Sequence, residues 1–303
     1  MPYLRLAGGQ LAIGAAAIFA RFALLGAGPI AVSAARMTLA ALVLLVFSGG
    51  VKPLSMRREI AFVLAGLALA IHFGSWIASL QYTSVAISTL LVTTTPLWTE
   101  AYDVVRERRP PSREFLTSLG LGFVGVVLVA KQPAPSAPPL PGHVLFGDAL
   151  ALLGSITIGA YFLIVRDVGA EPRGARLPTR TIVVRTYGWA AFALLVAAAL
   201  AHQDLPAGSN LSAWGGIVAM ALVSQLLGHT ELNAALRYFR PSIVALSTLA
   251  EPAVAAVLAA LVFHEFLGQA TVVGGILVLV AVALALRASK PGTVESLSAE
   301  IST

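Results

Sequence analysis

Ten apolar runs follow one another along this chain, each about as long as a membrane is thick, with only short polar segments between them. A helix needs roughly 20 apolar residues to cross the hydrocarbon core of a bilayer. The sequence therefore predicts an all-α integral membrane protein with ten transmembrane helices. We expect these helices at residues 6–25, 30–48, 60–81, 84–103, 114–131, 146–165, 181–201, 212–236, 242–263 and 270–287.

The composition argues against a water-soluble protein. Of the 303 residues, 58% are hydrophobic and only 11% are charged, whereas about a quarter of the residues in a soluble domain are charged. The lipid bilayer is therefore the expected surrounding of most of the chain. The net charge of +6 does not indicate a nucleic-acid partner, because the basic residues lie in short loops and form no basic or aromatic array.

The distribution of Lys and Arg predicts the orientation. With the amino terminus taken as cytoplasmic, only Lys131 of the 20 basic residues falls in an outer segment. Short loops rich in Lys and Arg stay in the cytoplasm. We therefore expect both termini to be cytoplasmic, in a bacterial inner membrane. The inner segments hold Arg5, Lys52, Arg57, Arg58, Arg106, Arg108, Arg109, Arg113, Arg166, Arg173, Arg176, Arg180, Arg237, Arg240, Arg287 and Lys290.

A proline-rich segment divides the chain into two halves of five predicted helices. Prolines hold a linker extended and cannot continue a neighbouring helix. We expect an amino-terminal five-helix repeat over residues 1–131, an outer linker over 132–145, a carboxy-terminal five-helix repeat over 146–287 and a cytoplasmic tail over 288–303.

The two halves carry the same pattern. Pro96 and Pro252 lie 156 positions apart in the fourth and ninth predicted helices, and Arg36 in the second matches Arg185 in the seventh. Each proline removes a backbone donor, so we expect both helices to be broken near it. Because five is odd, the second half must enter the membrane from the opposite side, an inverted repeat typical of alternating-access transporters. At the same spacing, Ala78, Leu80, Tyr82, Ile87 and Leu90 fall on Ala234, Leu236, Tyr238, Ile243 and Leu246.

These features resemble a known family. The run from Pro252 to Glu265, followed by Gly274 and Gly275 in the last helix, is similar to the second-repeat signature of the EamA type of the drug/metabolite transporter superfamily. Within it, the chain looks similar to the YddG-type exporters of aromatic and neutral amino acids. The resemblance implies a secondary transporter that exports aromatic or hydrophobic amino acids and related metabolites across the inner membrane, without a cofactor.

Glu251 lies near the middle of the ninth predicted helix, where burying a carboxyl group in a membrane is costly. An ionisable group inside a span costs a few kcal/mol or more and usually faces a cavity or a partner. Ser247 and Thr248 lie one turn earlier on the same face of the helix. We expect this group to contact the ammonium of a substrate or to carry a coupling proton. The alternative is a protonated Glu that is hydrogen-bonded to a neighbouring helix.

Two aromatic stripes complete a candidate substrate site. His72 and Trp76 share one face of the third predicted helix, and Thr94 and Trp98 share one face of the fourth. Large rings with a polar edge can stack on a planar ligand. The alternative is ordinary packing, or a belt at the membrane interface.

Further polar residues lie deep in other spans. We add Tyr161 of the sixth predicted helix and Gln225 and His229 of the eighth to the candidate substrate-binding residues. The alternative role for these groups is hydrogen bonding between helices.

The fifth and tenth predicted helices contain no ionisable residue over 115–130 and 270–286. We expect them to form a peripheral scaffold that packs through Gly120, Gly122, Gly125, Gly274 and Gly275. At the cytoplasmic end of the fourth predicted helix, we expect Glu100 and Asp103 to pair with Arg106 and Arg109.

Several activities lack their motifs. No glycine-rich phosphate loop is present for ATP, and His264-Glu265 lacks the second His of a zinc-protease motif, so we expect neither an enzyme nor a metal site. Three alternatives stay open: a broad-specificity drug or metabolite exporter, a membrane-embedded enzyme acting on lipid, and a channel. Protons are a candidate coupling ion, and the oligomeric state is not predicted.

Overall fold

The computed structural model describes residues 2–48, 50, 53–83, 85–131, 143–169, 176–263 and 268–288. Most of the predicted linker (132–142), the tail beyond residue 288, and Glu265 lie outside the described residues. The first half contains α1 (Pro2–Gly14), α2 (Ala16–Ala23), α3 (Pro29–Phe47), α4 (Met56–Ser79), α5 (Val85–Val92), α6 (Thr95–Glu107) and α7 (Arg113–Ala130). The second half contains α8 (Val144–Gly169), α9 (Thr179–Leu200), α10 (Leu211–Ala219), the π-helix η1 (Met220–His229), α11 (Thr230–Ala235), α12 (Pro241–Ser247), the 3-10 helix η2 (Thr248–Ala250), α13 (Glu251–Phe263) and α14 (Gln269–Ala288).

The predicted all-α membrane fold is confirmed. Within the described residues, nine helical stretches are long and apolar enough to cross a membrane. The fourth predicted helix, 84–103, is not one of them, because it is divided into α5 and α6 and neither part is long enough alone. The first, eighth and ninth predicted helices are also interrupted, at Ala15, over η1 and at η2.

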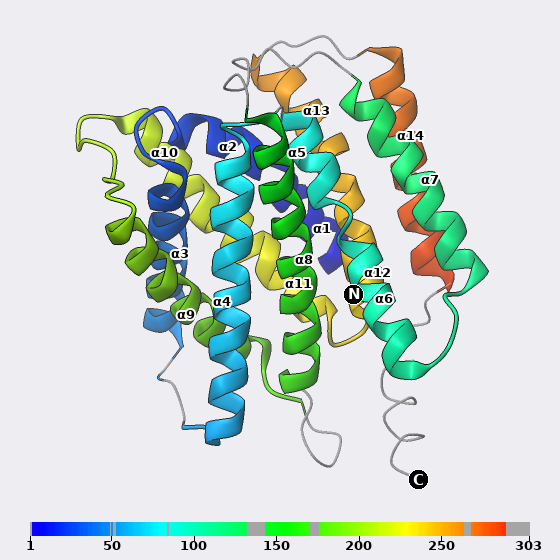
Figure 1. The fold of residues 1–303 in the computed structure, drawn as a ribbon, viewed down its shortest axis with the longest axis horizontal. Coiled ribbons are helices and arrows are strands. Elements are labelled where there is room, and N and C mark those ends of the chain that lie inside the picture. The colour runs from blue at the N-terminus through cyan, green and yellow to red at the C-terminus, as the bar shows by residue number, and fades with distance from the viewer. Residues whose placement is uncertain are drawn as a thin grey trace.

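The helices of the two halves interleave, and equivalent segments of the halves make equivalent contacts (Figure 1). Helix α4 of the first half packs against α8 of the second. In the repeat, α4 corresponds to α10 and η1, and α8 corresponds to α1 and α2; these segments also pack together, α10 against α2 and η1 against α1. Two further contacts join equivalent helices directly, α3 with α9 and α7 with α14, and α6 packs against α12, the counterpart of α5. The core of the molecule therefore lies between the halves rather than inside either one.

Helices α7 and α14 form the peripheral pair at one edge of the bundle (Figure 1). A Cβ atom on Gly125 would lie 2.6 Å from the carbonyl oxygen of Gly274, and one on Gly274 would lie 2.5 Å from that of Gly125. These two glycines let the helix backbones touch, as predicted. The predicted packing role of Gly120 is wrong, because a Cβ atom there would meet nothing within 4 Å.

Both proline-containing helices break at the same place in the repeat. Helix α6 begins at Thr95 and α13 at Glu251, so each has its proline at the second position. The breaks precede the prolines rather than following them. Backbone carbonyls that lose their helical partner need another donor inside a membrane.

Side-chain hydroxyls supply those donors. The hydroxyl of Thr95 donates to the carbonyl of Val92 at 2.8 Å, the carbonyl that Pro96 has no N–H to reach. In the second half, Ser247 donates to Val244 at 2.6 Å and Thr248 to Ala245 at 2.7 Å. The threonines and serines beside each break therefore stabilise it locally.

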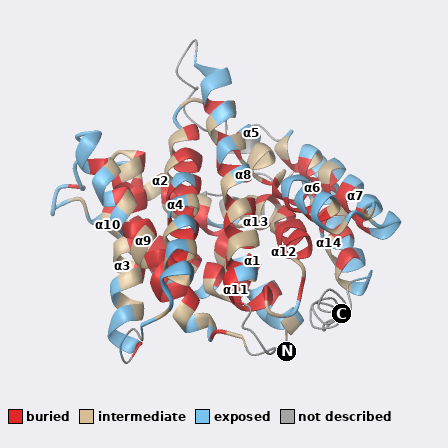
Figure 2. Cartoon of the chain, turned by 60° about the horizontal axis from the view of Figure 1, so that its bottom comes forward, coloured by how far each residue is buried: buried red, intermediate tan, exposed pale blue. Residues whose placement is uncertain are grey.

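Burial follows the expectation for a chain surrounded by lipid (Figure 2). Buried residues lie on the faces that the helices turn toward one another, and large apolar side chains remain exposed on the outside, for example Leu145 at 84% and Val46 at 77%. An exterior of this kind is stable only in an apolar solvent.

Candidate functional site

A cavity lies in the middle of the bundle, where the two helix breaks meet the inner faces of α1, α2, α3, α4, α8, η1 and α11. Its volume is about 30 Å³, which suits about one or two water molecules. A larger ligand would enter only if the walls moved apart. The lining residues are Ile13, Ala16, Arg36, His72, Phe73, Trp76, Val92, Thr95, Ile158, Phe162, His229, Leu232, Thr248 and Glu251.

Equivalent positions of the two halves contribute to the lining. At the repeat spacing of 156, Thr95 corresponds to Glu251, and both face the cavity. Matching positions of the two halves therefore line the same cavity, although the two residues of each pair differ in chemistry. The other pairs of this kind are Phe73 with His229, Trp76 with Leu232, and Val92 with Thr248.

The predicted aromatic residues of α4 lie at this cavity. The ring of His72 stacks on that of Trp76, with 6.4 Å between centroids and 6° between planes. The Nδ1 of His72 lies 2.9 Å from the carbonyl oxygen of Gly154, and because a carbonyl only accepts, Nδ1 carries the hydrogen. In the neutral ring, Nε2 is then left as an acceptor. His229 of η1 meets Phe73 edge-on at 5.1 Å.

Glu251 begins α13 and faces the same cavity together with Thr248. Its position follows from the helix break, which places the first turn of α13 at the centre of the bundle. The described part of the chain offers its carboxylate no hydrogen bond and no ion pair. The alternative of a Glu hydrogen-bonded to a neighbouring helix therefore has no described partner.

Three other predicted residues support the walls without lining the cavity. Ser247 accepts a hydrogen bond from Nε2 of Gln10 at 2.7 Å, which ties the end of α12 to α1. Tyr161 of α8 donates to Oδ1 of Asn233 at 2.7 Å. Gln225 of η1 accepts from Arg36. For Tyr161 and Gln225, these contacts are the hydrogen bonds between helices that were the alternative to substrate binding.

Thr94 and Trp98 lie away from the cavity. The indole of Trp98 donates to the hydroxyl of Ser155 at 3.1 Å, and the hydroxyl of Thr94 is 2.8 Å from the same oxygen. The side chain of Trp98 is also 40% exposed. Both residues therefore join the break between α5 and α6 to α8.

Arg36 of α3 is a cavity residue that the sequence did not single out as a site. It is fully buried, its Nη2 donates to Oε1 of Gln225 at 2.7 Å, and its guanidinium carbon lies 4.1 Å from the ring centroid of Phe73. Its Nε and Nη1 have no hydrogen-bond partner. In the sequence, Arg36 is an arginine within a predicted span, which could have indicated a site. There it indicated only that the two halves match, through its counterpart Arg185.

Gln225 and His229 lie on the π-helix η1. The backbone N–H of Thr230 donates to the carbonyl of Gln225, five residues earlier, and the hydroxyl of Tyr187 approaches that carbonyl at 3.5 Å. The wider turn changes which side chains share a face of the helix. Such segments occur frequently at functional sites.

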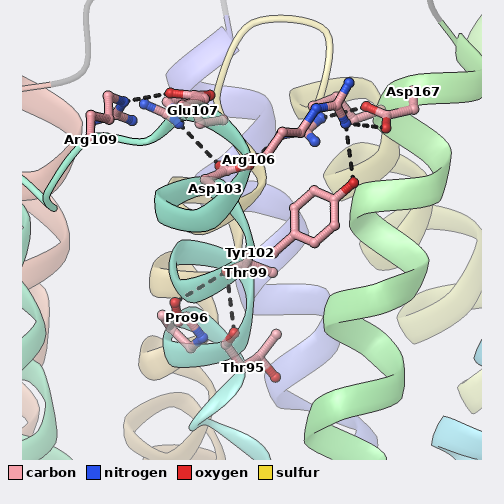
Figure 3. A network of polar contacts seen from close by, with 11 residues as sticks. Thr95, Pro96, Thr99, Tyr102, Asp103, Arg106, Glu107, Arg109 and Asp167 are labelled. Carbon is pink, nitrogen blue, oxygen red and sulfur yellow. Dashed lines mark hydrogen bonds and ion pairs between the residues drawn. The ribbon is translucent and has the colours of Figure 1, made fainter.

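An ion-pair network surrounds the end of α6 (Figure 3). The buried carboxylate of Asp103 accepts from Nη1 of Arg166 at 2.7 Å and from Nη2 of Arg240 at 3.2 Å. Arg240 also donates to Glu107 at 2.7 Å. Because Asp103 and Glu107 belong to α6, and both arginines belong to the second half, the network joins the two halves.

The predicted pairing of Asp103 with Arg106 and Arg109 is therefore wrong. Arg106 donates to Asp167 of α8, and Arg109 pairs with Glu107 (Figure 3). Helix spacing alone favoured neighbours on the same helix. The arginines of the second half reach Asp103 instead, because α6 packs against α8 and α12.

Comparisons with known proteins agree with this architecture. A family model described as the EamA-like transporter family matches residues 2–131 and 145–287. The uncharacterized transporter YyaM of Bacillus subtilis (strain 168) is 23% identical over 240 residues, which cover 78% of this chain and 77% of that protein. A solved structure, described only as the crystal structure of a protein, has a TM-score of 0.73 at 16% identity and covers 95% of this chain and 97% of its own. This last likeness shows the fold alone.

Proposed function

Because this chain belongs to the EamA-like transporter family, we propose that it exports aromatic or hydrophobic amino acids and related metabolites by alternating access. One observation carries the proposal: the unpaired carboxylate of Glu251 faces a central cavity whose other walls are largely apolar and aromatic. In this proposal Glu251 contacts the ammonium of the substrate, and Trp76 and Phe73 contact its apolar part.

The inverted halves provide the movement. The cavity lies between them and close to both helix breaks, so a rocking of one half against the other would expose it to one side of the membrane at a time. The network around Asp103 holds one end shut in the described conformation. The basic loops suggest that this end faces the cytoplasm, with the protein in a bacterial inner membrane.

Transport by purified protein in liposomes tests this assignment. We expect Glu251→Gln to reduce phenylalanine counterflow by about tenfold or more, because a hydrogen bond to a charged group contributes about 1.5–3 kcal/mol and tenfold corresponds to about 1.4 kcal/mol. We expect a similar loss in Trp76→Ala, because burial of a large apolar group contributes about 1.5–3 kcal/mol. Glu231→Gln is the matched control, since Glu231 pairs with Arg5 away from the cavity. Counterflow that is unchanged in both cavity variants would remove Glu251 and Trp76 from the site.

A competition experiment separates the proposal from a broad drug exporter. We expect aromatic amino acids to inhibit phenylalanine counterflow and cationic dyes to inhibit it weakly, because the cavity carries the cation Arg36 as well as Glu251. Inhibition by dyes alone would favour the drug exporter. The same assay addresses the channel alternative, since a channel shows no stimulation by substrate on the opposite side.

A further inference from the structure

The cavity contains a cation whose hydrogen-bonding capacity is largely unused. Arg36 is completely buried in the bundle, and two of its three guanidinium nitrogens, Nε and Nη1, have no partner among the residues that the structure describes. No carboxylate among the described residues pairs with it. A buried charge of this kind is costly in a protein and more costly in a membrane, so it usually marks a binding group.

The equivalent arginine of the other half shows how this fold satisfies such a residue. Arg185 of α9 donates to Oε2 of Glu59 at 3.0 Å, and the other carboxylate oxygen of Glu59 accepts from Trp189 at 3.1 Å. The two arginines occupy matching positions in a repeated sequence. Among the described residues, a carboxylate pairs with Arg185 and none pairs with Arg36.

The surroundings of Arg36 hold it in a fixed position. Gln225 accepts from Nη2, and the ring of Phe73 lies 4.1 Å from the guanidinium carbon, a distance at which an aromatic ring attracts a cation. The amide Nε2 of Gln225 is also buried without a partner. Arg36, which lines the cavity, thus has two unused donor nitrogens among the described residues, and its partner Gln225 has a third.

We infer that Arg36, held in place by Gln225, forms a carboxylate-binding site, so that the transported molecule carries a carboxylate as well as an apolar part. Charged donors bind carboxylates about twice as strongly as neutral donors do. This inference rests on the proposed function for its location and adds the second charge of the substrate. With Glu251 in the same cavity, the site then complements an amino-acid zwitterion: carboxylate at Arg36, ammonium at Glu251.

Matched ligand pairs test the inference in the wild-type protein. We would measure thermal stabilisation of the purified transporter by phenylalanine and phenylalanine amide, and by 3-phenylpropionate and 3-phenylpropionamide. In each pair the second compound has a neutral amide in place of the carboxylate. We expect the carboxylate of at least one pair to bind at least tenfold more tightly than its amide.

Variants then assign the preference to a residue. Arg36→Gln is expected to weaken binding of the carboxylate to the level of the amide, while binding of the amide stays the same. Arg185→Gln is the matched control, because it removes the equivalent arginine outside the cavity, and it is expected to preserve the ratio within the pair. If Arg36→Gln does not fold, the wild-type pairs still decide whether a carboxylate is recognised.

The outcomes distinguish the two proposals. Discrimination in the phenylpropionate pair without binding of phenylalanine would support the carboxylate site and contradict amino-acid export. Equal binding of carboxylate and amide in both pairs would overturn the carboxylate site, and phenylalanine counterflow would still report on export. If Arg36→Gln weakens binding of the carboxylate and of the amide to the same extent, the carboxylate site would also be overturned. The arginine would then support the cavity rather than bind the anion.

Discussion

Replacing Asp103 with asparagine is expected to destabilise the transporter by about 3–5 kcal/mol, the usual cost of breaking a buried ion pair from one side. The carboxylate of Asp103 is 0% exposed, and its two partners Arg166 and Arg240 are 13% and 18% exposed. The substitution keeps the shape of the side chain but leaves both guanidinium groups short of negative charge. Thermal unfolding in detergent would measure the loss.

The matched control is Asp167→Asn. Asp167 is 42% exposed and pairs with Arg106, which is 50% exposed, and with Arg166 at 2.9 Å. A pair that water reaches contributes about 0–1 kcal/mol. Equal destabilisation by the two substitutions would mean that burial and the connection between halves do not distinguish Asp103.

The same substitution is expected to loosen one end of the bundle. The chain contains no cysteine, so a single cysteine introduced at Ile158, a cavity residue, can be labelled without background. We expect a membrane-impermeant maleimide to react faster with Ile158→Cys when Asp103→Asn is also present, from the side of the network. An unchanged rate from that side would show that the ion pairs stabilise the fold without controlling access.

The second large effect is expected at the contact between α7 and α14. Valine at Gly125 should destabilise the protein by about 3 kcal/mol, at the upper end of the usual cost of overpacking. The added atoms would lie within 2.6 Å of a backbone carbonyl of Gly274, and backbone cannot move aside as a flexible side chain can. Expression level and thermal unfolding would report the change.

Gly120→Val provides the comparison on the same helix. Gly120→Val changes the helix propensity by the same amount as Gly125→Val does. A Cβ atom at Gly120, however, would meet nothing within 4 Å among the described residues, so we expect little change in stability. If the two valine variants unfold at the same temperature, the close contact at Gly125 contributes nothing measurable.

The sequence predicted the architecture because lipid imposes simple requirements. Apolar length indicates where helices cross, and an odd number of helices per half requires the halves to be inverted. Prolines correctly marked two of the four interrupted helices, the fourth and the ninth. They did not locate the breaks, which depend on whether nearby hydroxyls, such as that of Thr95, can satisfy the freed carbonyls.

The site was harder to predict, because periodicity places residues on a face without identifying the neighbour. The spacing of Thr94 and Trp98 put both on one face of the fourth helix, but that face meets Ser155 rather than the cavity. Arg36 is the opposite case. Nothing local distinguishes it from Arg185, and only the arrangement of neighbouring helices shows that it lacks a carboxylate.

The shared position of the two helix breaks also bears on how such proteins diverge. The breaks come from backbone and hydroxyl groups that both halves possess, whereas the cavity residues beside them, Thr95 and Glu251, differ between the halves. If the cavity binds the cargo as we propose, substitutions at these positions change the cargo and leave the helix breaks intact. Gene duplication followed by divergence at a few cavity positions would produce relatives that move in the same way but carry different molecules.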